Sequence, residues 1–502
     1  MTDEVIKKWL SNGSHFSKYE VFMNEKKQIA ISAIDNNKEI FTALSDRIWE
    51  YAELSLKEFK SADDYCKTLA SLGFEVEKNV ADIPTAFLGK WGEGKPIIGI
   101  LGEYDALSGL SQVGGSAERC ELVKGGCGHG CGHNLLGAGA LAAAYGIKEY
   151  LKSTGKSGTV IFYGTPGEEG GAGKAFMAKE GIWYDLDAAL TWHPFDVNEV
   201  SVGTCNSCIQ VLYKYKGVAS HAAGNPEHGR SALDAVELMN VGVQYLREHT
   251  KDDARIHYAI IDGGGASPNV VQPTASVLYM VRSKLVKDAL ELQARVDKIA
   301  EGAALMTETT FERVFIDGCS GTVSNSPLEE LAYKNMNEIP LPEYTAEEEA
   351  LAEKIKATYE SHGTLSIAAQ YSKEAKAEIE ALTDGGKTAL NRFVAPLHRG
   401  DHFSPGSTDV GDVSWQTPTV QLYTACFTSG APGHSWQNVS LGKTSIAHKG
   451  MLYAAKALAA TAVELYESPE ILAAAKAEFK ENTKDGYYCP IPKDEYAKAV
   501  EI

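Results

Sequence analysis

The sequence predicts an α/β protein whose main domain is a mostly parallel, doubly wound sheet. Short, continuous apolar runs bounded by Gly or Pro are typical of strands covered on both faces, and helical stretches lie between them. The chain has 502 residues, which exceeds the usual size of one hydrophobic core, so two domains are expected. The runs that predict buried parallel strands are residues 96–101, 158–163, 188–192 and 419–426.

Two of the connecting segments predict helices directly. Asn134 is a residue type that caps helix N-termini, and it precedes an Ala-rich stretch that reaches Leu151. A second helix is expected after the glycines at 170, 171 and 173. Alternation of strand and helix in this order is what a doubly wound sheet requires.

A change of pattern marks a second domain in the middle of the chain. The predicted order is βαββαβ, which is typical of a four-stranded antiparallel sheet with two helices on one face. Its elements are a strand at 208–215, a helix at 231–249, strands at 255–261 and 275–282, a helix at 286–306 and a strand at 310–316. We therefore expect a ferredoxin-like domain over residues 207–318, inserted in a parallel-sheet domain of residues 1–206 and 319–502. Residues 344–387, rich in Glu, Lys and Ala, predict solvated helices joined by a Gly-containing loop.

Composition limits the classes of partner. The formal charge of −19 is spread along the chain without a basic cluster, which argues against nucleic acid or an anionic membrane. Residues 1–20 are polar and do not resemble a signal peptide, and the longest apolar stretch, 135–147, is too short to span a bilayer. Nine dispersed cysteines fit a reducing compartment. We expect a cytoplasmic protein that acts on a small molecule.

Potential metal ligands follow the predicted strands. In an open parallel sheet the carboxyl ends of the strands meet at one crevice, so ligands far apart in sequence can converge there. The candidates combine soft, borderline and hard donors: Cys131, His133, the pair Glu168 and Glu169, His193 and His434. In the acidic pair, one carboxylate can bind metal while the other takes a proton from water.

Each candidate also has a structural interpretation. The segment 126–133 could be a Gly-rich turn with incidental Cys and His, the acidic pair a solvated loop, and a lone His a hydrogen-bonding residue. The position of these residues after buried strands favours the metal site. Cys127 and His129 are weaker candidates, because one turn cannot aim four side chains at one ion. Asp105 is the preferred partner to hold a ligating imidazole, with a turn-forming aspartate as the alternative.

Taken together, these motifs resemble those of the M20 metallopeptidases, in the amidohydrolase branch of that family. The resemblance covers nearly the whole chain. It rests on residues 128–134 (GHGCGHN), 165–171 (TPGEEGG), 191–194 (TWHP), 219–226 (ASHAAGNP), 231–235 (SALDA), 268–273 (PNVVQP) and 407–415 (STDVGDVSW).

This resemblance implies a two-metal site, with Zn or Mn as the first candidate ions. The implied ligands are Cys131, His133, Glu169, His193 and His434, with Glu168 as general base. The chain has Glu103-Tyr104-Asp105 where the branch more commonly has Asp-X-Asp, and Asn134 where it has Asp. These departures concern the residues around the ligands. The family's peptidases have a carboxylate in place of Cys131, so their metal preference does not transfer.

The resemblance also implies that the parallel-sheet domain is a zinc-peptidase-like catalytic domain and that the ferredoxin-like domain of residues 207–318 is a lid and dimerisation domain, which supplies substrate contacts. His221 matches a residue that reaches the partner subunit's active site and polarises the scissile carbonyl. Asn269 and Arg282 match positions that hold the substrate carboxylate, for which a guanidinium is well suited. The alternative for Arg282 is an exposed charge at a strand end. Cys205 and Cys208 have the spacing of half a redox or zinc motif, but no second pair exists, so we interpret them as incidental.

We therefore expect a metallo-amidohydrolase that cleaves the amide bond of an N-acyl or aminobenzoyl amino acid, such as p-aminobenzoyl-glutamate. Its substrate should be a small molecule with a free carboxylate, and it should act as a homodimer or as a heteromer with a related chain. Two alternatives remain: a dipeptidase with the same site, and a non-catalytic subunit of a heteromeric hydrolase. The presence of every ligand and of the base argues against the second.

Overall fold

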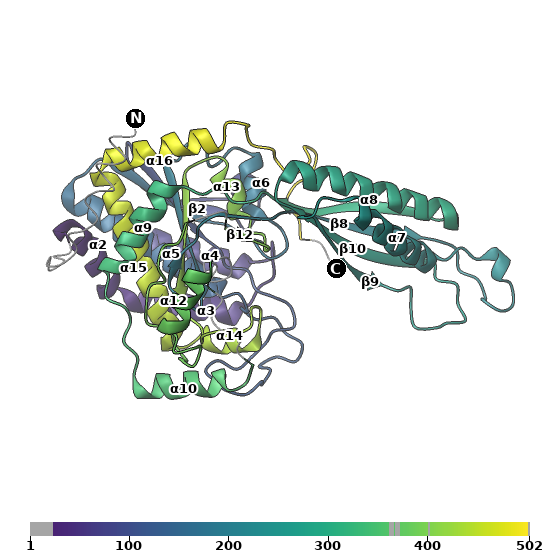
Figure 1. Cartoon of the computed structure of the whole chain (residues 1–502), viewed down its shortest axis with the longest axis horizontal. Coiled ribbons are helices and arrows are strands. Elements are labelled where there is room, and N and C mark those ends of the chain that lie inside the picture. Colours follow the sequence, from purple (N-terminus) through teal and green to yellow (C-terminus); the bar gives the residue numbers. More distant parts are fainter. Residues whose placement is uncertain (1–23, 361–365, 367–371, 400–401, 500–502) are drawn as a thin grey trace.

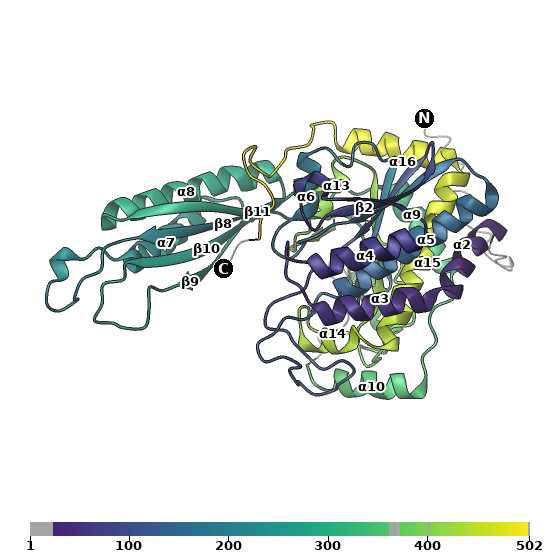
Figure 2. The same ribbon diagram turned by 180° about the vertical axis from the view of Figure 1, so that it is seen from behind.

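The structure is a computed structural model that describes residues 24–360, 366, 372–399 and 402–499. Figure 1 shows two parts, a broad body and an elongated arm that extends from one side of it. The body contains elements from both ends of the chain, whereas the arm is built from its middle, and Figure 2 shows the same division from behind. The polar segment 1–20 lies outside the described residues.

A seven-stranded sheet forms the centre of the body, in the order β1-β2-β4-β3-β5-β13-β6. The neighbours β4-β3-β5-β13 are parallel, and the outer pairings are antiparallel. The strands are β1 (Glu75–Lys78), β2 (Phe87–Glu93), β3 (Ile97–Gly102), β4 (Gly158–Gly164), β5 (Ala188–Phe195), β6 (Glu199–Val200) and β13 (Thr419–Ala425). The four parallel strands are the four predicted from apolar runs, so the predicted fold class is confirmed.

Helices pack around this sheet. They are α2 (Glu25–Asn36), α3 (Lys38–Tyr51), α4 (Phe59–Ser71), α5 (His133–Thr154), α6 (Gly173–Lys179), α9 (Ser326–Glu338), α10 (Ala346–Lys356), α12 (Lys373–Leu382), α13 (Val410–Ser414), α14 (Trp436–Leu441), α15 (Ser445–Glu467) and α16 (Pro469–Asn482). The buried helix α5 packs against α15, α2 and the strands β3 to β5. Close approach requires its small residues: a Cβ at Gly139 would lie 2.7 Å from the Trp192 ring.

The start of α5 differs from the prediction. The N-cap residue is Gly132, whose φ of 83° is a left-handed conformation that favours glycine, so the helix begins at His133. Asn134 therefore lies inside the first turn, and its amide donates to Ser45 Oγ and to the Gly442 carbonyl, both at 3.0 Å. The prediction that Asn134 caps the helix was wrong, because its side chain joins distant segments instead.

The arm is a four-stranded antiparallel sheet in the order β11-β8-β10-β9, with two helices that pack against it and each other. Its elements follow the βαββαβ order: β8 (Ser207–Lys216), α7 (Ala232–Leu246), the short 3-10 helix η3 (Arg247–His249), β9 (Arg255–Asp262), β10 (Thr274–Ser283), α8 (Val286–Thr307) and β11 (Thr310–Cys319). The arm joins the body where β8 begins and β11 ends, so two adjacent strands form its root (Figure 1). The strand β9 is an edge strand and exposes Tyr258, Ile260 and Ile261.

The remaining predicted segment, 344–387, contains α10 and α12, and each buries apolar side chains such as Ile355 and Ile379. Part of the loop between them, including Gly363, lies outside the described residues. Among the helices that the structure describes, none is long and apolar enough to cross a membrane.

Candidate metal centre and active site

The five side chains predicted as metal ligands gather at the carboxyl edge of the parallel strands. They form two groups that share Cys131: one contains His133 and His193, and the other contains Glu169 and His434. In each group the potential ligand atoms all lie within 4.8 Å of one another. A sulfur atom common to both groups is the arrangement expected of two neighbouring ions with one bridging ligand.

Hydrogen bonds fix the imidazoles of His133 and His193 with the same nitrogen free. The Nδ1 atom of His133 lies 2.8 Å from Asp105 Oδ1, and the Nδ1 atom of His193 lies 2.8 Å from the Pro194 carbonyl oxygen. Each Nδ1 therefore carries the proton that it shares with oxygen, and each Nε2 is left to bind metal. The Nε2 atom of His193 lies 3.3 Å from Cys131 Sγ, on the side where the ligands meet.

Asp105 organises this cluster. Its Oδ1 faces His133, and its Oδ2 accepts hydrogen bonds from Ser55 Oγ at 2.8 Å and from the backbone N–H of Glu169 at 2.9 Å. Burial acts to raise the pKa of Asp105, but the neighbouring His133 ring and these hydrogen bonds lower it to about 2. One ionised carboxylate thus holds a ligand of each group in place.

His434 contributes from the loop between β13 and α14. Its φ is 51°, in the left-handed region that few residues other than glycine adopt, and its Nε2 lies 3.5 Å from Glu169 Oε1. Strain of this kind persists where the surroundings impose a conformation, and it is common at functional sites. The His434 side chain is 56% exposed, so it forms the open side of the cluster.

Glu168 lies beside the ligands without belonging to either group that shares Cys131. It is grouped instead with Glu103 and His133, at distances of at most 4.8 Å. Burial first, and then the charges of Glu103 and Glu169, raise the pKa of Glu168 well above its usual range. A carboxylate in such surroundings has a high affinity for a proton, which suits a group that accepts one from water and passes it on.

The donor atoms fit divalent metal ions. Three buried atoms in the cluster have no hydrogen-bond partner among the described residues: Glu103 Oε2, His133 Nε2 and Glu169 Oε1. Buried polar atoms without partners are costly, and a cation would satisfy all three. Thiolate and imidazole favour Zn²⁺, whereas carboxylates also suit Mn²⁺, so the set does not by itself select the ion.

A cleft of about 250 Å³ opens onto the cluster. Besides the ligands it is lined by small polar side chains and by two aromatic rings. The polar residues are Ser201, Thr204, Thr322, Ser404, Ser407, Thr408 and Gln421. The rings of Phe195 and Tyr423 lie with their centroids 4.8 Å apart. The cleft therefore offers an apolar wall and a hydrogen-bonding wall beside the potential metal ligands.

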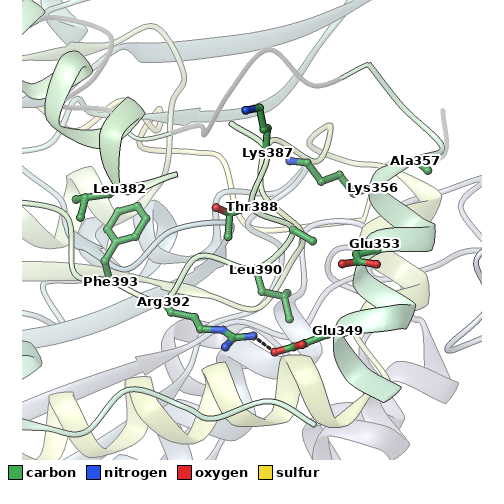
Figure 3. A pocket seen from close by; sticks show the side chains of 11 residues that line it. Glu349, Glu353, Lys356, Ala357, Leu382, Lys387, Thr388, Leu390, Arg392 and Phe393 are labelled. Atoms are coloured by element: carbon green, nitrogen blue, oxygen red, sulfur yellow. Dashed lines mark hydrogen bonds and ion pairs between the residues drawn. The ribbon is translucent and has the colours of Figure 1, made fainter. Parts of the chain in front are cut away.

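A second, larger cavity of about 750 Å³ lies elsewhere in the body. It is enclosed by α10, the end of α12 and residues 387–393, and it shares no lining residue with the cleft. Figure 3 shows Lys356 and Lys387 at one side of it and the ion pair between Arg392 and Glu349 at the other. Among the residues that the structure describes, none of the potential metal-ligand groups lies at this cavity, so the cleft is the candidate active site.

Three predicted substrate contacts lie in the arm, and only one is near the cleft. Arg282, at the root, donates from Nη1 to Ser407 Oγ at 2.8 Å, and Ser407 lines the cleft. His221 and Asn269 are exposed neighbours beyond the far end of β8, where the Ala222 amide donates to the Asn269 carbonyl at 3.0 Å. Ten residues of strand span roughly 33 Å. Within one chain, His221 and Asn269 are therefore far from the metal ligands.

The other Cys and His residues of the motifs do not belong to the potential metal-ligand groups of the described residues. The Nε2 atom of His129 lies 3.0 Å from the Ile48 carbonyl oxygen, and burial lowers the pKa of this imidazole to about 4. Cys127 belongs to none of the potential metal groups of the described residues. Cys208 is paired in register with Cys319, with their sulfur atoms 3.2 Å apart, and Cys205 lines the cleft.

Sequence reasoning missed three functional candidates. The buried ammonium of Lys174 lies 2.6 Å from both Glu103 Oε1 and Asp409 Oδ1, directly behind the metal cluster. Asp409 lies within residues 407–415, a segment that contributes to the family resemblance. No role was predicted for any single side chain of that segment. Tyr423, in the middle of β13, has the sequence surroundings of an ordinary buried strand residue. One signal in the sequence could have indicated such a residue: Lys174 is a charged residue inside a mostly apolar helix.

Comparison with known proteins agrees with this geometry. The profile of Peptidase family M20/M25/M40 matches residues 99–460. The chain is 47% identical over 481 residues to the B subunit of the p-aminobenzoyl-glutamate hydrolase of Escherichia coli (strain K12), covering 94% of this chain and 98% of that protein. It is 28% identical over 473 residues to the Xaa-Arg dipeptidase of Mus musculus, covering 90% and 92%. A putative aminohydrolase from methicillin resistant Staphylococcus aureus has the same fold, with a TM-score of 0.57 and 17% identity, over 87% of this chain and 99% of that one.

Proposed function

The chain belongs to peptidase family M20/M25/M40 and is a metal-dependent hydrolase of amide bonds, and from that premise we propose that it hydrolyses p-aminobenzoyl-glutamate or a closely similar aromatic acyl amino acid. The observation that carries this proposal is the 47% identity, over almost the whole of both chains, to a protein named for that substrate. The cleft supports it, because an aromatic pair and a set of hydroxyl groups flank the metal ligands.

The proposed site holds two divalent ions, Zn²⁺ or Mn²⁺, on the two groups that share Cys131. When bound, such ions polarise the scissile carbonyl and activate water for attack at neutral pH. The chain's own residues orient the ligands and transfer the proton. Asp105 orients His133 and Glu169, and Glu168 accepts the proton of the attacking water and delivers it to the amine of the departing amino acid.

The two walls of the cleft would orient the substrate. The acyl ring would pack against Phe195 and Tyr423, since offset aromatic contacts add to simple burial of apolar area. The amino-acid carboxylate would lie near Ser407 and receive the guanidinium of Arg282, which already reaches that residue. Binding both ends of the molecule holds the amide at the ligands, which is a large part of the rate enhancement.

We further propose that the active site is completed by a second chain. His221 and Asn269 are exposed at the far end of the arm, too distant to serve their own chain. The edge strand β9 would pair with a second copy, because an exposed apolar edge is otherwise a liability. A homodimer is the simpler arrangement, and the Escherichia coli relative is named as one subunit of its enzyme, which keeps a heteromer as the alternative. A cytoplasmic location stays a prediction.

A release assay on the purified chain tests the substrate. The enzyme, loaded with Zn²⁺, Mn²⁺ or Co²⁺ in turn, is offered p-aminobenzoyl-glutamate, acetyl-glutamate and dipeptides ending in Arg. Preferred release of p-aminobenzoate is expected. Faster cleavage of the dipeptides would support the dipeptidase activity named for the Mus musculus relative. If no metal gives turnover of any compound, the proposal that the chain acts without a different partner chain is wrong.

The aromatic wall provides a sharper version of this test. Replacing Phe195 by Leu should lower kcat/KM for p-aminobenzoyl-glutamate by about 2- to 12-fold, since aromatic pairs contribute about 0.5–1.5 kcal/mol beyond area burial. The same variant should leave kcat/KM for acetyl-glutamate within about twofold. Equal losses on both substrates would mean that the ring acts on the shape of the site and not on the acyl group.

A further inference from the structure

Glu103 directs its two carboxylate oxygens toward different groups. The residue follows β3 directly and is 2% exposed. Its Oε1 lies 2.6 Å from Lys174 Nζ, whereas its Oε2 lies 3.2 Å from His133 Nε2. Neither Glu103 Oε2 nor His133 Nε2 has a hydrogen-bond partner within the described chain. A carboxylate oxygen therefore directly faces the nitrogen atom that is left to bind metal.

This contact needs a positive charge. Because His133 Nδ1 shares its proton with Asp105, a His133 ring that binds metal keeps its proton there and presents a lone pair at Nε2. Two lone pairs 3.2 Å apart repel unless a cation or a proton lies between them. Ligand atoms about 2.1 Å from one ion are separated by roughly 3.0 to 3.4 Å in octahedral and tetrahedral shells. The observed separation of 3.2 Å falls within that range.

Lys174 and Asp409 hold the carboxylate in this orientation. The Nζ atom of Lys174 lies 2.6 Å from both Glu103 Oε1 and Asp409 Oδ1, and its backbone N–H donates to Asp409 Oδ2 at 2.9 Å. All three side chains are at most 3% exposed. One ammonium between two carboxylates leaves a net negative charge, so the buried triad still attracts a cation. In Glu103, the anchored oxygen Oε1 faces Lys174, and the free oxygen Oε2 faces His133.

We propose that Glu103 is a sixth protein ligand, which binds through Oε2 the metal ion that His133 holds, and that Lys174 and Asp409 are positioning residues for it. An aspartate at this position would be shorter by one methylene group. An added hard oxygen donor shifts the preference of this ion site toward Mn²⁺ relative to Zn²⁺.

The inference rests on the metal dependence within the proposed function, but not on the proposed substrate. Metal binding is therefore measured directly. The full-length chain is stripped with a chelator and titrated with Co²⁺, whose visible absorption reports coordination number, and bound metal is counted by elemental analysis. The variants are Glu103→Gln and, as a matched control, Glu329→Gln, which removes a buried carboxylate paired with Arg399 outside the cluster.

Wild-type protein and Glu329→Gln are expected to bind two Co²⁺ ions with the same spectrum. Glu103→Gln should bind one of the two ions at least about 10-fold more weakly, with stronger visible absorption, because the coordination number falls. Unchanged affinity and spectrum in Glu103→Gln would overturn the proposal and make Glu103 the counter-ion of a protonated His133. This result does not depend on which amide the enzyme cleaves, so a failed release assay leaves it intact.

A second variant covers the case in which Glu103→Gln does not fold. Glu103→Asp keeps the charge for Lys174 but shortens the reach toward His133. A changed Co²⁺ spectrum with the circular dichroism of the wild type supports direct ligation. A wild-type spectrum in the aspartate variant would show that the carboxylate does not contact the metal and would overturn the proposal.

Discussion

Replacing Asp105 by Asn should weaken metal binding by about 10- to 100-fold. The carboxylate serves both ligand groups, since Oδ1 faces His133 Nδ1 at 2.8 Å and Oδ2 accepts from the Glu169 amide at 2.9 Å. A side-chain amide has only one oxygen. In either orientation of that amide, His133 Nδ1 or the Glu169 N–H therefore faces an NH₂ group instead of an oxygen. A hydrogen bond to a charged group contributes about 1.5–3 kcal/mol, and each 1.4 kcal/mol is a factor of about 10 in affinity.

The assay is competition for Zn²⁺ between the protein and a chromophoric chelator, with circular dichroism to confirm the fold. Ser55→Ala is the matched control, because it removes a donor to Asp105 Oδ2 and leaves both ligand contacts intact. It should weaken metal binding clearly less than Asp105→Asn does, because the carboxylate contacts with His133 and Glu169 both remain. Equal affinities of Asp105→Asn and wild type, or equal losses in both variants, would refute the idea that Asp105 acts on the ligands.

Three further outcomes are expected. Glu168→Gln should lower kcat by about 10²- to 10⁴-fold with full metal content, because the proton carrier is lost and the shape is kept; loss of metal in this variant, with retention in Glu169→Gln, would mean that the two roles are exchanged. Inactive His221→Ala and Glu168→Gln chains, mixed under exchange conditions, should regain part of the activity, and no recovery with mixed dimers confirmed by mass would show that each chain completes its own site. Burial raises the pKa of Asp317, near the root of the arm, to about 7, against about 3.9 in an unfolded chain. Its contribution to stability is therefore full below about pH 4 and is lost as the pH rises through about 7. Asp317→Asn should thus flatten the fall of melting temperature between about pH 5 and pH 8, and an unchanged slope would contradict the assignment.

The sequence predicts the four parallel strands of the body well because their burial is nearly uniform, whereas it gives no prediction for β1 and β2, which are partly exposed. The predicted run at residues 188–192 lies within β5, whose first five residues are all buried, so local composition alone is sufficient to find it. The strand order of the arm follows as well, since each of its strands and helices carries its own periodic pattern. The convergence of the candidate ligands was predictable for a related reason: a parallel sheet brings the ends of its strands to one edge.

What the sequence does not predict is pairing between distant charged groups. The packing of α6 against α13 brings Lys174 to Asp409, and the end of β3 brings Glu103 to the same ammonium group, so the contacts join three separate segments. The error at Asn134 has the same origin. Its side chain could have capped a helix locally, but Ser45 and Gly442 provide partners from segments far away in the chain. Long-range contacts of this kind override local preference.

The place of β13 in the sheet has a consequence for synthesis on the ribosome. This strand pairs with β5 on one side and β6 on the other, yet it emerges more than 200 residues after them, with the whole arm in between. At a rate of synthesis of about 5–20 residues per second, the edge of β5 stays unpaired for roughly 10 to 45 s until β13 has been made. The arm, whose strands are contiguous in sequence, can fold during that interval. The unpaired apolar edge of the nascent body is then the surface that holdase chaperones must cover.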